Sequence, residues 1–96
     1  MYSHIVVWNI KEPKEKSIEF LSELLLSMKE KIPQIVDVQV GANIDSQFTN
    51  RDFVLMTTHN SKEDIYNYQN HPYHLEVKEK VSPYLSERVC IDTVLA

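Results

Sequence analysis

Residues 66–78 read Tyr-Asn-Tyr-Gln-Asn-His-Pro-Tyr-His-Leu-Glu-Val-Lys, and the break inside this stretch decides the predicted fold. Pro72 pushes the backbone of His71 out of helical geometry. Proline also suits the first position of a new helix, because it has no N–H group to leave unpaired there. The stretch therefore predicts that a helix over residues 62–69 ends at this corner and that a second helix covers residues 72–81.

The segments on either side of this corner show the patterns of strands and of one long helix. The predicted strands cover residues 2–11, 35–40, 51–58 and 87–95, and the long amphipathic helix covers residues 13–31. This order of elements is that of a ferredoxin-like split βαβ unit. We therefore predict an α+β fold in which a four-stranded antiparallel sheet carries helices on one face.

The first predicted strand has apolar side chains on both of its faces. One face carries His4, Val6, Trp8 and Ile10, and the other carries Ile5, Val7 and Asn9. A strand with two apolar faces is typical of a sheet that is covered on both sides. Since the helices cover one face, a second subunit is the simplest cover for the other. The expected assembly is a homodimer through the open sheet face, which makes a dimeric α+β barrel.

The composition sets the remaining limits. At 96 residues the chain is expected to form one domain, residues 1–96. Its net charge of −4 and the lack of a Lys/Arg cluster argue against nucleic acid or an anionic membrane as a partner. The single cysteine, Cys90, excludes an intrachain disulfide, and its apolar surroundings predict that it is buried. The sequence shows no basic-apolar leader and no apolar run of membrane-spanning length, which favours a cytoplasmic location.

Two residues of the corner suggest acid–base chemistry. His74 lies in the first turn of the second helix, where the helix dipole favours a neutral imidazole that can accept a proton near pH 7. Tyr68 can polarise a carbonyl oxygen through its O–H group, provided that the two helices fold back on each other. The alternative is that these side chains, together with an inward-facing His4, are only packing residues. His59, at the end of a strand, is expected to be exposed.

Several stretches of the chain carry a resemblance to a known family. They are residues 4–11 (HIVVWNIK), 32–35 (IPQI), 38–43 (VQVGAN) and 68–74 (YQNHPYH), together with Asp92 in the last strand. In this combination the chain resembles the stress-responsive A/B barrel (Dabb) family over nearly its whole length. The resemblance implies a dimeric α+β barrel with a pocket between the sheet and the helices of each subunit.

The resemblance also implies roles for individual residues. In a plant polyketide cyclase of this family, olivetolic acid cyclase, a Tyr and a His that match Tyr68 and His74 carry the acid–base work. The residues that match His4 and Asp92 line or support the site, and Asp92 is expected to fix the tautomer of His74. The candidate catalytic residues are therefore Tyr68, His74 and Asp92. The candidate ligand-binding residues are His4, Val6, Trp8 and His71, although an N-cap position already accounts for His71.

Three hypotheses follow for the function. The first is a homodimer that binds a small carbonyl-containing molecule and, if it is an enzyme, transfers protons without a cofactor in a cyclase-, aldolase- or isomerase-like reaction. The second is a non-catalytic stress-response or ligand-binding protein. The third is a haem-degrading monooxygenase, which is disfavoured because Asn9 lies on the strand face opposite Trp8. No metal site is expected, since His71 and His74 lie on either side of a helix start and need not share a face.

Overall fold

The computed structural model describes residues 1–45 and 47–95. Along the chain the elements are β1 (Tyr2–Ile10), α1 (Lys14–Leu26), α2 (Met28–Lys31), β2 (Asp37–Ala42), β3 (Phe53–His59), α3 (Lys62–Gln69), α4 (Pro72–Val81), the 3-10 helix η1 (Ser82–Tyr84) and β4 (Leu85–Val94). The predicted α+β class and the predicted order of elements are confirmed. Among the residues described, no helix is both long enough and apolar enough to cross a membrane.

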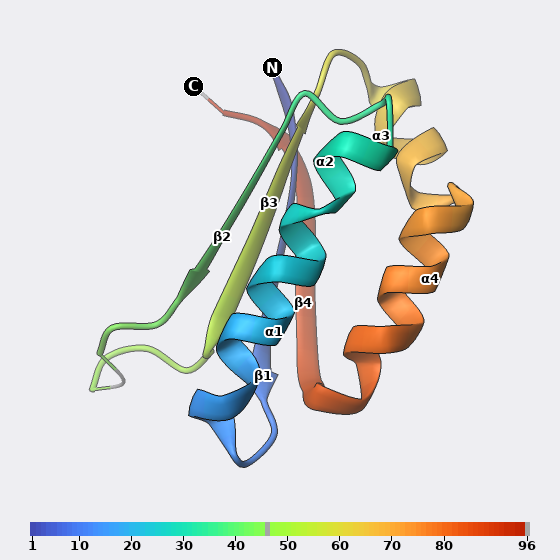
Figure 1. Ribbon diagram of the computed structural model, residues 1–96. Helices are drawn as coiled ribbons and strands as arrows, with labels where there is room; N and C mark the ends of the chain where they lie inside the picture. Colours follow the sequence, from blue (N-terminus) through green and yellow to red (C-terminus); the bar gives the residue numbers. More distant parts are fainter. Residues whose placement is uncertain (46, 96) are drawn as a thin grey trace.

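The strands form one sheet in the order β2-β3-β1-β4, and each neighbouring pair is antiparallel. Figure 1 shows α1 and α4 running side by side over the same face of the sheet, with α3 beyond the end of α4. This arrangement is the predicted ferredoxin-like unit. It places the proline corner between α3 and α4 on the helix-covered side of the central strand β1.

The core lies between this sheet face and the helices. Side chains alternate along β1, so that every second one points toward the helices. These inward side chains, His4, Val6, Trp8 and Ile10, are all buried, as predicted. From the helices, Leu21, Leu25 and Met28 close the core, because they recur at the spacing that lines one helix face. The side chain of His4 is therefore held inside the protein.

The opposite sheet face carries two rows of apolar side chains that continue across three strands. The rows are Met56–Ile5–Ile91 and Val54–Val7–Val89, each written in the order β3, β1, β4. Val89 is 49% exposed and Ile91 is 58% exposed. The helices lie on the other side, so this face is open in the single chain (Figure 1).

The structure corrects the prediction of one continuous long helix and the prediction that Cys90 is buried. The long helix is divided at Ser27, whose Oγ donates to the Leu24 carbonyl oxygen at 2.6 Å and accepts from the Tyr73 hydroxyl at 2.7 Å. A serine that bonds back to the preceding turn bends a helix in this way. The prediction that Cys90 is buried is wrong: the thiol is exposed, because β4 is an edge strand.

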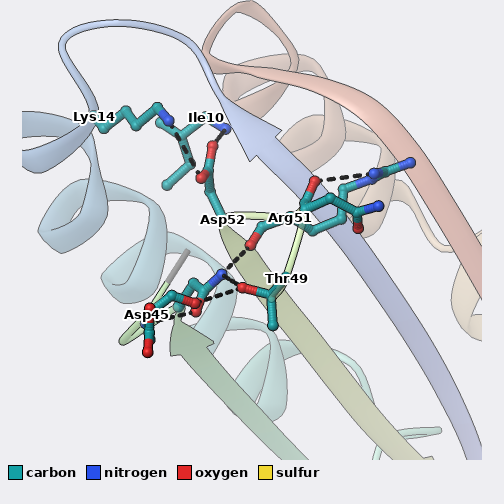
Figure 2. Close-up of polar contacts among 8 residues, drawn as sticks. Ile10, Lys14, Asp45, Thr49, Arg51 and Asp52 are labelled. Carbon is teal, nitrogen blue, oxygen red and sulfur yellow. Dashed lines mark hydrogen bonds and ion pairs between the residues drawn. The ribbon is translucent and has the colours of Figure 1, made fainter. Parts of the chain in front are cut away.

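A set of polar contacts orders the connection between β2 and β3 (Figure 2). Nδ2 of Asn43 donates to the Thr49 hydroxyl at 2.6 Å and to the Arg51 carbonyl oxygen at 2.7 Å. Asp52 then accepts from the backbone N–H of Ile10 at 2.8 Å and from Nζ of Lys14 at 3.3 Å. The Asp52 carboxylate thus joins the start of β3 to the end of β1 and to the first turn of α1.

Candidate functional site

Three histidines surround the ring of Tyr68, which comes from α3 and is fully buried. The ring centroid of Tyr68 lies 5.7 Å from that of His4 on β1, 5.1 Å from that of His59 on β3 and 4.6 Å from that of His74 on α4. The proline corner therefore folds α4 back so that His74 meets Tyr68 over the buried face of the sheet. This cluster of Tyr68, His4, His59 and His74 is the histidine–tyrosine cluster.

The corner is built by two side-chain caps. The Ser61 hydroxyl accepts from the backbone N–H of Asp64 at 3.0 Å and begins α3. Nδ1 of His71 accepts from the backbone N–H of Tyr73 at 3.0 Å and begins α4, with Pro72 as its first residue. His71 is thus the predicted N-cap. It is not among the residues that line the cavity described below, so its position gives no support to a ligand-binding role.

His74 is held as a neutral imidazole with one defined tautomer. Its Nδ1 lies 2.9 Å from the carbonyl oxygen of Gln69, and a carbonyl can only accept, so Nδ1 carries the proton. Burial lowers the pKa of His74 from its usual 6.5, and the positive charges of Lys78 and Arg88 act in the same direction. At neutral pH, Nε2 of His74 is therefore unprotonated and can accept a proton.

The hydroxyl of Tyr68 is a buried donor that lacks a hydrogen-bond partner within the described chain. Burial raises the pKa of Tyr68 to about 12, which keeps the hydroxyl protonated at neutral pH. The Thr57 side chain opposes that shift, as a nearby hydrogen-bond acceptor would, but its oxygen and the Tyr68 hydroxyl do not meet as a hydrogen bond. Because Thr57 donates its proton to Nε2 of His59 at 2.8 Å, its oxygen is left as an acceptor. A buried polar group without a partner costs free energy, and native proteins retain few of them.

Asp92 pairs with His4 and not with His74. Oδ1 of Asp92 lies 2.5 Å from Nδ1 of His4, whose side chain is 3% exposed while that of Asp92 is 52% exposed. The two residues are directly opposite each other in the pairing of β1 with β4. The predicted contact between Asp92 and His74 is wrong, because the Gln69 carbonyl occupies Nδ1 of His74. The carboxylate instead orients the His4 imidazole.

The prediction that His59 is exposed is also wrong, since its side chain is fully buried. Nδ1 of His59 donates to the carbonyl oxygen of Gln34 at 2.7 Å, and Nε2 accepts from Thr57. Burial lowers its pKa below 6.5. Both ring nitrogens are satisfied by the protein, so His59 is a structural member of the cluster. The alternation of buried residues along β3 (Phe53, Leu55, Thr57 and His59) is the pattern that identifies it.

A cavity of about 460 Å³ opens beside the histidine–tyrosine cluster, between α4 and the strands β1 and β4. The cluster residues His4, Tyr68 and His74 form part of its wall, and the predicted ligand-binding residues Val6 and Trp8 line it as well. Its apolar wall also includes Leu25, Met28, Leu55, Val77, Val81 and Leu85, and its polar wall includes Gln69, Lys78, Glu87 and Arg88. The cavity thus combines an apolar body with a few polar groups, which is typical of small-molecule sites.

The structure gives no candidate metal centre in residues 1–45 and 47–95. No group of three or more His, Cys, Asp or Glu side chains in these ranges is arranged to hold a metal ion. The histidines of the cluster have their Nδ1 atoms bonded to carbonyl or carboxylate oxygens, and the cluster contains no cysteine.

Solved structures with the same fold cover nearly the whole chain. A dimeric ferredoxin-like protein of unknown function from Thermobifida fusca is 22% identical, with a TM-score of 0.84 over 98% of this chain and 90% of that one. A protein from Arabidopsis thaliana is 19% identical, with a TM-score of 0.90 over 100% and 96%. The hydroxynitrile lyase from Passiflora edulis is 17% identical, with a TM-score of 0.85 over 99% and 93%. At such identities the likeness shows the fold alone.

The sequence itself identifies the family. A comparison with curated proteins gave no match. The sequence profile of the Stress responsive A/B Barrel Domain matches residues 3–95, from the first strand to the end of the last. The chain therefore belongs to the stress-responsive A/B barrel (Dabb) family.

Proposed function

We propose that the cavity binds a small carbonyl-containing molecule and that His74 exchanges a proton with it. The observation that carries this proposal is the Tyr68 hydroxyl, a buried donor without a partner, next to a neutral imidazole with a free Nε2. A carbonyl oxygen of the ligand would supply the missing acceptor. A phenylalanine at this position would pack as well and would avoid the free-energy cost of a buried hydroxyl without a partner. The presence of tyrosine therefore supports a role of the hydroxyl in binding.

The two groups have complementary tasks in such a reaction. The Tyr68 O–H donates a hydrogen bond to the carbonyl oxygen and stabilises the negative charge that develops there. Nε2 of His74 removes a proton from the carbon beside the carbonyl and can return it elsewhere on the molecule. His4, oriented by Asp92, faces the same tyrosine ring and presents a second imidazole to the cavity. This chemistry, that of an isomerase, aldolase or cyclase, uses only side chains of the protein.

The proposal includes a homodimer through the open sheet face. The rows Met56–Ile5–Ile91 and Val54–Val7–Val89 form a contiguous apolar surface, and large apolar patches on a soluble protein mark interaction sites. The Thermobifida fusca neighbour is itself described as a dimeric ferredoxin-like protein. Pairing two such sheets buries both surfaces and produces the α+β barrel.

Of the two alternatives, the non-catalytic ligand-binding protein uses the same cavity and differs only in the task of His74. The Passiflora edulis neighbour is by its name a lyase, so the fold accommodates an enzyme. The haem-degrading alternative has less support, because Asn9 does not line the cavity with Trp8.

The decisive experiment measures proton exchange and binding separately. 4-Phenyl-2-butanone is incubated with the protein in D₂O, and loss of the protons beside its carbonyl is followed by proton NMR. Binding is measured by titration of a ¹⁵N-labelled sample. We expect the wild type to accelerate exchange, His74→Ala to abolish it while binding changes little, and His71→Asn to retain it. His71→Asn is the matched control, because asparagine keeps the N-cap of α4.

The outcomes separate the hypotheses. Binding of the ketone at the cavity without accelerated exchange would support the non-catalytic alternative. Exchange that persists in His74→Ala would refute the assigned role of His74. Chemical-shift changes confined to residues outside the cavity would refute the site itself.

A further inference from the structure

The last strand contains an irregularity next to the cavity. Val7 pairs with Val89 and Asn9 pairs with Ser86, so that one residue of β1, Trp8, faces the two residues between them on β4. Glu87, one of these two, has a φ of 53°. Positive φ is uncommon for residues other than glycine and is found at bulges. We call Glu87 and Arg88 the β4 bulge.

The bulge lies at the wall of the cavity. In a regular strand successive side chains alternate between the two faces, so only one residue would lie opposite Trp8 on the helix side. Glu87 and Arg88 both line the cavity, together with Leu85 and Ser86 before them. The Glu87 carbonyl oxygen accepts a hydrogen bond from Nε of Arg51 at 3.0 Å, which holds the bulge from outside the cavity.

The bulge adds a second cation, Arg88, to the cavity wall that Lys78 already lines. Lys78 lies four residues after His74 on α4, so both side chains fall on the same helix face, about 6 Å apart along the axis. Arg88 lies four residues before Asp92 on β4 and hence on the same side of that strand. The charges of Lys78 and Arg88 both act on His74. The cavity wall therefore carries two cations in addition to its histidines.

Neither cation is neutralised by an ion pair within the described residues. The lysine two residues further along α4, Lys80, has Glu76 4.0 Å away. Glu87 is the one carboxylate among the described residues that line the cavity, so the two cations leave an excess of one positive charge. This excess stands out in a chain whose net charge is −4.

We infer that the ligand of the cavity is an organic acid, whose carboxylate is bound by Arg88 and Lys78 while its carbonyl lies at Tyr68 and His74. This inference rests on the proposed function and adds the class of ligand. Arginine suits the task, because its guanidinium binds a carboxylate through two parallel hydrogen bonds. Lys78 lies about 6 Å from His74 along α4, which suits a carboxylate two to three carbon atoms from the carbonyl.

The test compares acids with their own amides, which have nearly the same shape and the same ketone. The probes are 3-benzoylpropanoate and 4-benzoylbutanoate with the corresponding primary amides, titrated into the full chain by calorimetry and ¹⁵N NMR. We expect each acid to bind at least about tenfold more tightly than its amide, the usual effect of a charge-assisted hydrogen bond. Arg88→Gln and Lys78→Gln should reduce that preference, and Glu87→Gln should increase it.

Lys80→Gln is the matched control, because it removes one positive charge from the same helix at a residue that does not line the cavity. It should leave the acid-to-amide ratio unchanged. Amides that bind as tightly as the acids would overturn the inference and leave the proposed function standing. A preference for acids that survives in both Arg88→Gln and Lys78→Gln would also overturn it. If neither the acids nor the amides bind at the cavity, both the inference and the proposed function fail.

Discussion

Replacing Tyr68 with phenylalanine should stabilise the protein while weakening its binding of carbonyl compounds. The substitution removes a hydroxyl that is fully buried and has no hydrogen-bond partner in the described chain, and it keeps the ring that packs against three histidines. A buried polar group left unsatisfied costs about 1–3 kcal/mol. Taking the lower end, we expect the free energy of unfolding to rise by about 1 kcal/mol, which raises Tm by about 4–8 °C in a domain of this size.

Tyr73→Phe is the matched control, and we expect it to lower the stability of the protein. The Tyr73 hydroxyl donates to Oγ of Ser27 at 2.7 Å, so its removal breaks a hydrogen bond and leaves the Ser27 oxygen with one partner fewer. We expect a loss of about 1 kcal/mol. Both variants are measured by urea unfolding and by thermal melting at one protein concentration, because association shifts apparent stability.

The refuting results are specific to each half of the prediction. A loss of stability in Tyr68→Phe comparable to that in Tyr73→Phe would show that the Tyr68 hydroxyl donates a hydrogen bond within the protein in solution. The Thr57 hydroxyl oxygen would then be the expected acceptor. Unchanged affinity for 4-phenyl-2-butanone in Tyr68→Phe would show that the hydroxyl does not bind the ligand carbonyl. Affinity should instead fall by about tenfold, the effect of one hydrogen bond.

Three further predictions concern pH, assembly and capping. Burial lowers the pKa of His59 and His74 below 6.5, so the unfolded chain binds more protons than the folded chain as the pH falls below 6.5. The free energy of unfolding should therefore stay constant above pH 6.5 and decrease between pH 6.5 and 5. An unfolding free energy that does not change with pH in this range, measured with urea, would contradict the prediction. Ile91→Asp places a carboxylate in the proposed dimer interface and should convert the dimer to monomer in sedimentation velocity; an unchanged assembly would exclude that face. Ser61→Ala removes the cap on the Asp64 N–H and should cost about 1 kcal/mol by urea unfolding, with a change within a few tenths of a kcal/mol counting against the cap.

The local features of the fold could be predicted because they are written in short stretches of sequence. Pro72 and His71 determine where α4 begins, and the observed helix covers the predicted residues 72–81. The alternation along β1 predicted that His4 points inward. Both inferences depend on steric and periodic rules that act within about ten residues. The family match over residues 3–95 agrees with the order of elements derived from them.

The partner of each site residue could not be predicted in the same way. Asp92 meets His4 because of the register between β1 and β4, which is set by the whole sheet and not by either strand alone. The β4 bulge shifts that register, and the sequence around Glu87 contains no glycine to suggest a positive φ. The prediction for Cys90 is wrong for a related reason: an apolar pattern indicates a strand, but not whether that strand lies at the edge of the sheet.

The β4 bulge also bears on how the protein behaves when it is concentrated. β4 is an edge strand, and a flat, regular edge offers unpaired N–H and C=O groups on which further chains can add. A bulge with two charged residues interrupts that template, and we expect it to hinder the extension of the sheet from one molecule to the next. We therefore expect the residues that line the cavity on β4 also to protect this outer strand against fibrous self-association.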